Sequence, residues 1–221
     1  MSFLKKYGGL IIGLAMVSEL VLPVVLSRFN PAYNPLSQLT SFLAEEGAPT
    51  ENAYRIWSIT NGVFIVLGTP GFYQRFAATS HQISMWLCRM LAVFALASCV
   101  LPWVIGRSSP TATTGAQIAL SDYASSAGLL ALLASLALLT RLYRLEKNPF
   151  MSTVLPLMLV IALVSTLLFA IPRIPIINQL HFPYRGLWQR GSLLFTQVPF
   201  VIVGIRSIRT RVTSVKDSTD E

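Results

Sequence analysis

Six long apolar runs, separated by short polar segments, dominate the pattern of the chain. Each run is close to the roughly 20 residues that an α-helix needs to cross the hydrocarbon core of a bilayer. We therefore expect an all-α polytopic integral membrane protein, a six-transmembrane-helix bundle in one domain over residues 1–211, with a polar cytoplasmic tail over 212–221. The predicted spans are residues 10–26, 56–73, 83–105, 118–139, 154–171 and 187–205.

The first run differs from the core of a cleaved signal peptide. Lys5 and Lys6 precede it, as basic residues precede a signal core, but Glu19 lies inside it. A charge within a signal core is unusual, and the run is long enough to span a bilayer. We expect a retained first helix.

The longest connection, residues 28–55, has an amphipathic pattern of its own. Asn34 is suited to cap a helix that has Pro35 at its first position and ends at Gly47. This pattern predicts a short helix that lies in the outer membrane interface. Its apolar face would be formed by Leu36, Leu39 and Leu43.

Composition agrees with a membrane location, because 53% of the residues are hydrophobic and only 12% are charged. These values exclude disordered, collagen-like and coiled-coil chains. With a cytoplasmic N-terminus, ten of the 17 basic residues would lie on the inner side and six on the outer side. The positive-inside rule then places both termini in the cytoplasm, and it explains the net charge of +8 without nucleic acid as a partner.

Four ionisable side chains lie inside or at the margins of the predicted spans: Glu19, Arg89, Asp122 and Arg190. Each costs about 2.5–3.5 kcal/mol near the membrane centre, so such residues usually face the protein interior. An ion pair of Arg190 with Glu19 or Asp122 would lower that cost. A functional site is the alternative, and Asp122 would also be favoured in the first turn of the fourth helix.

Two further carboxylates, Glu45 and Glu46, would lie at the C-terminal end of the short interfacial helix, where the helix dipole disfavours negative charge. Either an outer arginine or a cationic substrate would compensate them. The arginines expected on that side of the membrane include Arg28, Arg55, Arg185 and Arg190.

Patterns for metal binding or nucleophilic catalysis are absent. Cys88 and Cys99 are eleven residues apart in one predicted helix, too far for a disulfide, and are interpreted as packing residues. His81 and His181 are expected on opposite sides of the membrane. We therefore predict no cofactor, no metal and no assigned catalytic residue.

Four short motifs together resemble the domain-of-unknown-function 998 family. They are Tyr33-Asn-Pro-Leu-Ser37-Gln-Leu-Thr-Ser41, Asn61-Gly62, Asp122 and Gly186-Leu-Trp-Gln-Arg190. The resemblance implies a six-span protein of the prokaryotic plasma membrane, more distantly similar to the eukaryotic Frag1, DRAM and Sfk1 group, and it implies no established reaction. Many members carry a histidine one turn after the acidic residue, and Ser125 stands there in this chain.

The sequence predicts a non-enzymatic or accessory protein that binds a lipid headgroup or small amphiphile in an outward-facing polar pocket. The alternatives are an outer-leaflet lipid hydrolase or transferase, with Asp122 or Glu19 as base, and a small transporter. A homo-oligomer or a membrane-protein partner is a further possibility. The expected ligand-binding residues are Glu19, Ser37, Gln38, Ser41, Asn61, Asp122, Gln189 and Arg190.

Overall fold

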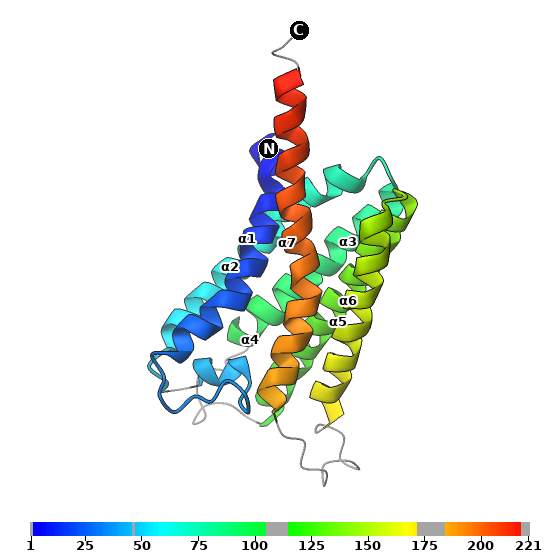
Figure 1. Cartoon of the computed structure of the whole chain (residues 1–221). Helices are drawn as coiled ribbons and strands as arrows, with labels where there is room; N and C mark the ends of the chain where they lie inside the picture. The colour runs from blue at the N-terminus through cyan, green and yellow to red at the C-terminus, as the bar shows by residue number, and fades with distance from the viewer. Residues whose placement is uncertain (1, 46, 105–114, 172–183, 218–221) are drawn as a thin grey trace.

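The computed structural model describes residues 2–45, 47–104, 115–171 and 184–217, and these segments contain helices, turns and loops but no strand (Figure 1). The expected all-α class is therefore confirmed for the described residues. The elements are α1 (Ser2–Ser27), η1 (Thr40–Ala44), α2 (Glu51–Phe76), α3 (His81–Phe94), η2 (Ala95–Val100), α4 (Leu101–Val104), α5 (Gly115–Leu145), α6 (Pro149–Ala170) and α7 (Arg185–Asp217).

Six helical rods form a closed ring when α3, η2 and α4 are taken as one continuous rod. Each rod packs against its neighbour in the chain, and α7 returns to pack against α1. Successive rods run in opposite directions, so both termini lie at one end of the ring, and η1 and α4 lie at the other (Figure 1). We call these the terminal end and the loop end.

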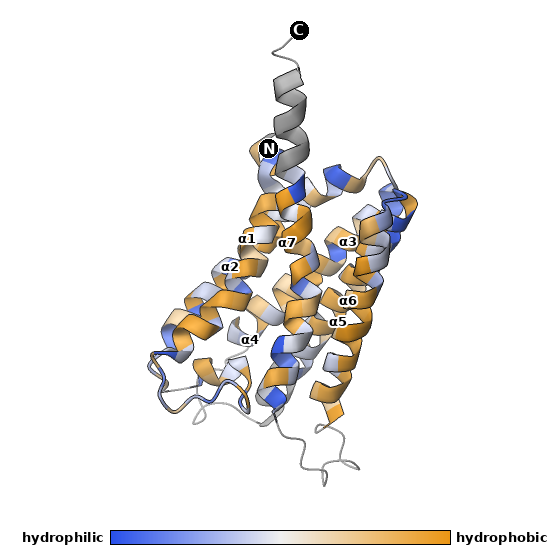
Figure 2. Ribbon diagram, viewed as in Figure 1, coloured by the Kyte–Doolittle hydropathy of each residue, from blue (hydrophilic) through white to orange (hydrophobic). Residues whose placement is uncertain are grey.

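The ring is filled by apolar side chains and is also apolar outside. Met16, Phe72 and Phe200 belong to one fully buried core that draws on all six rods. Leu130 and Leu157 are more than 60% exposed on the outer surface. Figure 2 shows apolar residues along most of the visible helix lengths. An outer surface of this kind favours lipid over water as the surrounding medium.

Within the described residues, four of the rods contain segments that are long and apolar enough to cross a membrane. These are Phe3–Ser27, His81–Val104, Asp122–Leu145 and Pro149–Ala170. They correspond to the predicted first, third, fourth and fifth spans. Helices α2 and α7 occupy the places of the second and sixth spans, whose crossing of the membrane stays a prediction.

Glycines bring α1 close to its two neighbours. A Cβ atom on Gly8 would lie 2.5 Å from the Gly68 carbonyl oxygen of α2, and one on Gly204 of α7 would lie 2.6 Å from the Gly9 carbonyl oxygen. Small residues of this kind allow membrane helices to pack backbone against backbone. The contacts therefore fix α1 between α2 and α7.

Two predicted elements differ from the structure. The helix expected from Asn34 to Gly47 is a five-residue 3-10 helix, η1, that is preceded by turns. Asn34 Oδ1 accepts a hydrogen bond from the Leu36 backbone N–H over 3.0 Å, so it closes a local turn instead of capping a helix. At the other end of the chain, α7 continues to Asp217, into the segment expected to be a polar tail.

Candidate functional site

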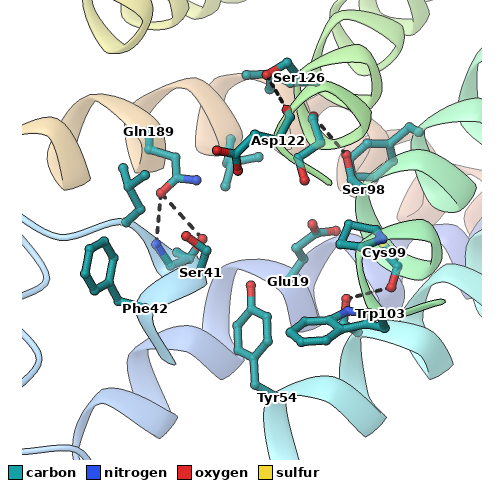
Figure 3. Close-up of a pocket in the computed structure, with 18 of the residues that line it drawn as sticks. Glu19, Ser41, Phe42, Tyr54, Ser98, Cys99, Trp103, Asp122, Ser126 and Gln189 are labelled. Carbon is teal, nitrogen blue, oxygen red and sulfur yellow. Dashed lines mark hydrogen bonds between the residues drawn. The ribbon is translucent and has the colours of Figure 1, made fainter. Parts of the chain in front are cut away.

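A cavity of about 430 Å³ lies inside the loop end of the ring (Figure 3). Every helical element from α1 to α7, including η1 and η2, contributes at least one residue to its wall. The volume falls in the range of about 300–1,000 Å³ that is typical of small-molecule sites. The ring therefore closes around a space large enough for the polar end of a ligand.

The wall of the cavity combines charged, hydroxyl and aromatic side chains. Its ionisable residues on α1, α5 and α7 are Glu19, Asp122 and Arg185, and Glu45 follows η1. Hydroxyl groups come from η1, α2, η2 and α5. The aromatic residues are Phe42, Tyr54, Trp57, Phe94, Trp103 and Phe169. Such a wall suits a ligand with both polar and apolar parts.

A chain of hydrogen bonds ends on the carboxylate of Glu19. Trp57 Nε1 donates to Ser18 Oγ over 3.2 Å, and Ser18 Oγ donates to Asn61 Oδ1 over 2.9 Å. Asn61 Nδ2 then donates to Glu19 Oε2 over 3.2 Å. Asn61 is 2% exposed, and Glu19 points into the cavity (Figure 3). The network fixes the orientation of the carboxylate from behind.

The loop between α1 and α2 forms one wall because it is docked on the N-terminal turns of α7. The Leu187 backbone N–H donates to the Leu36 carbonyl over 3.1 Å, and Gln189 Oε1 accepts from the Thr40 backbone N–H over 3.0 Å. A Cβ atom on Gly186 would lie 2.3 Å from the Gln38 carbonyl oxygen. The two motif segments around Tyr33–Ser41 and Gly186–Arg190 are therefore direct structural partners.

The π-helix η2 shapes the opposite wall. Pro102 has no backbone N–H and cannot donate a helical hydrogen bond. The Leu101 N–H donates to the carbonyl of Leu96, five residues earlier, which is the pattern of a π-helix. Ser58 Oγ donates to the Cys99 carbonyl over 3.0 Å and so satisfies part of the loosened backbone. Gly128 of α5 has no side chain, and Ser98 of the widened turn occupies the space where its Cβ atom would lie. This widening brings Ser98, Cys99 and Trp103 to the cavity.

Arg190 has a different role from the one expected. In the described part of the chain it forms a salt bridge with neither Glu19 nor Asp122, and it is not among the residues that line the cavity. Its Nη2 donates to the hydroxyl of Tyr33, and its guanidinium carbon lies 5.6 Å from the centre of that ring. The expected ion pairs with Arg190 are therefore not formed.

The Tyr33 partner of Arg190 is a neutral group. Burial raises the pKa of Tyr33 above its ordinary value, and the Arg190 guanidinium offsets part of that rise. The hydroxyl therefore stays protonated at neutral pH, and the contact is a hydrogen bond to a cation and not an ion pair. It links the loop before η1 to α7 at the rim of the ring.

The structure brings half of the predicted ligand-binding residues into the cavity wall. Those that line it are Glu19, Ser41, Asp122 and Gln189. Asn61 lies behind Glu19. Gln38 stabilises the loop between α1 and α2, where its Oε1 accepts from the Asn34 backbone N–H over 2.7 Å. Ser37 is exposed and does not line the cavity. Asp122 lies seven residues inside α5, not in its first turn.

Sequence reasoning assigned no ligand role to Arg185 or Trp103, and both line the cavity. The Nε of Arg185 and the Nε1 of Trp103 are buried, and neither has a hydrogen-bond partner among the described residues. The feature of the sequence that could have indicated a role for Arg185 is its place just before the predicted sixth span. Glu46 and His181 lie outside the described residues, and in the described part of the chain no cluster of three potential metal ligands occurs.

An all-helical ring with four apolar helices of membrane-spanning length defines this chain as a membrane protein. It belongs to a family described as proteins of unknown function, DUF998, whose sequence model matches residues 13–206. Comparison with curated proteins and with solved structures gave no match. The resemblance inferred from the motifs is thereby confirmed at the level of the family, and the distant similarity to the Frag1, DRAM and Sfk1 group stays a prediction.

Proposed function

We propose that the protein is a six-span protein of the prokaryotic plasma membrane that binds the polar head of a lipid or small amphiphile in the cavity at its loop end. The observation that carries this proposal is one cavity of about 430 Å³ with both charged and aromatic walls, inside a ring whose outer surface is apolar. Such a site suits a molecule whose polar end enters the protein from the membrane.

Packing supports six spans where hydropathy alone supports four. Helix α2 packs between α1 and α3, and α7 packs between α1 and α6. Because their neighbours are long enough to cross the membrane and adjacent rods run in opposite directions, α2 and α7 would cross it as well (Figure 1). The less apolar character of α7 is explained in part by Gln189, which faces the cavity and not lipid.

The charge distribution supports an outward-facing cavity. The terminal end carries basic residues on several rods and turns, and the positive-inside rule assigns such an end to the cytoplasm. The loop end would then face outward, with the cavity in reach of the outer leaflet. The basic residues of the terminal end include Lys5, Lys6, Arg75, Arg141, Arg144 and Lys147.

The test compares lipids that copurify with the wild-type protein and with two serine variants. Ser41→Trp fills the cavity, whereas Ser37→Trp makes the same change at an exposed position outside it. We expect a defined lipid in the wild type and in Ser37→Trp, and its loss in Ser41→Trp. Equal amounts of the same lipid in all three proteins, measured by mass spectrometry, would refute binding in the cavity.

A second candidate function rests on Glu19 and Asp122, which point into the same space from opposite walls (Figure 3). Two carboxylates around one cavity suit a hydrolase in which one of them acts as general base toward water. A hydrolase would release a soluble head group from the bound lipid over time, and Glu19→Gln or Asp122→Asn would abolish that release. A binding protein would return the lipid intact.

A further inference from the structure

The described part of the cavity wall carries more acidic than basic residues, although the protein is basic. The chain has 17 basic and nine acidic residues, and the described wall residues include three acidic ones, Glu19, Glu45 and Asp122, and one basic one, Arg185. In the described part of the chain Glu19 forms no salt bridge. Its carboxylate is therefore a candidate partner for a cation in the cavity.

The surroundings of Glu19 suit an ammonium group. Asn61 occupies one oxygen of the carboxylate from behind, so the group is held in place while it faces the cavity. Beside it, the ring of Tyr54 lies 5.1 Å from that of Trp57 and 6.1 Å from that of Trp103. Aromatic rings next to a carboxylate are a common arrangement for alkylammonium ions, because ring faces attract cations.

Arg185 gives the same cavity a group that suits an anion. Arg185 is the first residue of the 33-residue helix α7, and its Nε is buried and has no hydrogen-bond partner in the part of the chain that the structure describes. A guanidinium at a helix N-terminus favours phosphate through its donors and through the helix dipole. Trp103, whose ring belongs to the aromatic group beside Glu19, is 5% exposed, and its Nε1 is a further donor to the cavity that has no hydrogen-bond partner among the described residues. Buried donors of this kind normally have an acceptor.

We infer that the ligand of this cavity is zwitterionic, with an ammonium group at the wall formed by Glu19 and the aromatic rings and a phosphate at Arg185. The inference rests on the proposed function and specifies its ligand class. The shared chemistry is that of a phosphorylated amino alcohol, carried either by a phospholipid or by a water-soluble phosphoamine. A purely anionic head group has no ammonium group to pair with Glu19, and a purely cationic one has no phosphate to pair with Arg185.

The test measures binding of four probes to the full-length protein in detergent by native mass spectrometry. Three are lipids with identical dioleoyl chains: phosphatidylethanolamine, phosphatidylglycerol and a phosphate-free trimethylammonium lipid. The fourth is soluble glycerophosphoethanolamine. We expect phosphatidylethanolamine to bind about tenfold more tightly than either other lipid, because each would lose one charge-assisted contact.

Two variants assign the two halves of the head group. Glu19→Gln should reduce the preference for phosphatidylethanolamine over phosphatidylglycerol, and Asp122→Asn tests the same preference if Glu19→Gln does not fold. Arg185→Gln should weaken both phospholipids and leave the trimethylammonium lipid unchanged. Matched controls are Glu51→Gln and Arg28→Gln, which make the same changes at residues outside the cavity wall and should leave all affinities unchanged.

The outcomes separate this inference from the proposed function. Equal or tighter binding of phosphatidylglycerol would overturn the ammonium site, and equal binding of the trimethylammonium lipid would overturn the phosphate site, although lipid binding would stand. Glycerophosphoethanolamine that binds as tightly as the lipid would support the zwitterion but identify a soluble source. A folded protein that binds none of the four probes would refute the proposed function itself.

Discussion

Asn61 on α2 donates a hydrogen bond to Glu19 on α1 over 3.2 Å, deep in the loop-end half of the ring. The two residues belong to adjacent helices, and the amide is almost fully buried while the carboxylate faces the cavity. A charged group within a membrane is costly unless it is hydrogen bonded. Asn61 therefore makes it feasible to keep a carboxylate in the wall of the cavity.

Replacing this amide should destabilise the protein. Asn61→Ala removes the donor to Glu19 and the acceptor for Ser18 Oγ, so we expect a loss of about 1–3 kcal/mol in the free energy of unfolding. Thr60→Ala, the same kind of truncation at the exposed neighbouring position, should change stability by no more than about 0.5 kcal/mol. Thermal unfolding of the purified proteins measures both, and equal melting temperatures would contradict the role given to Asn61.

The rim contact between Tyr33 and Arg190 should be structural and not part of ligand binding. Tyr33→Phe keeps the ring over the guanidinium but removes the acceptor of Nη2, and we expect it to cost about 1–3 kcal/mol. Tyr184→Phe, at an exposed tyrosine on the same rim, should be nearly neutral. Lipid preference should be unchanged in both variants. A change in lipid preference with Tyr33→Phe alone would place Arg190 in the binding site after all.

The packing of η2 on α5 leaves no room for a methyl group at Gly128. An added Cβ would lie 2.0 Å from Ser98 Oγ and 3.0 Å from the Ser98 backbone nitrogen, so Gly128→Ala should cost about 1–3 kcal/mol despite the better helix propensity of alanine. Gly191→Ala is the matched control, because its nearest neighbour would be at an ordinary 3.4 Å. The control should be neutral or slightly stabilising in the same unfolding measurement, and equal stability of the two variants would contradict the tight contact.

The orientation of the ring in the membrane is testable with single cysteines in a protein from which Cys88 and Cys99 have been removed. Ser37→Cys at the loop end should react with an impermeant maleimide in intact cells. Ala78→Cys, exposed in the turn after α2 at the terminal end, should react only after lysis. The reverse pattern would place the cavity on the cytoplasmic side.

The length of the apolar runs is sufficient to locate the six rods, because in the described part of the chain each run lies in a helical rod. Run length could not locate η2, since this π turn depends on Pro102, which lacks a backbone N–H, and on Ser58 of α2, which donates to the Cys99 carbonyl. Likewise, the prediction of a helix from Asn34 to Gly47 treats the loop between α1 and α2 as an isolated segment. The contacts of that loop with α7 leave only η1 helical.

The sequence also could not show which arginine of α7, Arg185 or Arg190, lines the cavity. Arg185 and Gln189 are four residues apart and share one face of α7, whereas Arg190 lies about 140° around the helix from Arg185. Sequence alone gave charge and approximate depth but not the rotation of α7 about its axis. That rotation is set by the contacts of Gly186 and Leu187 with the loop between α1 and α2, which join segments about 150 residues apart in the chain.

The most direct test of the central claim is photo-crosslinking with a dioleoyl phospholipid that carries a diazirine next to its head group. The account predicts attachment to cavity-wall residues of the loop end, such as Ser41, Trp103 and Asp122, and loss of that labelling in the presence of excess unlabelled lipid. Peptide mass spectrometry of the labelled protein locates the adducts. Labelling confined to the outer apolar surface, for example at Leu130 and Leu157, and unaffected by competitor would show that the cavity does not bind a lipid head.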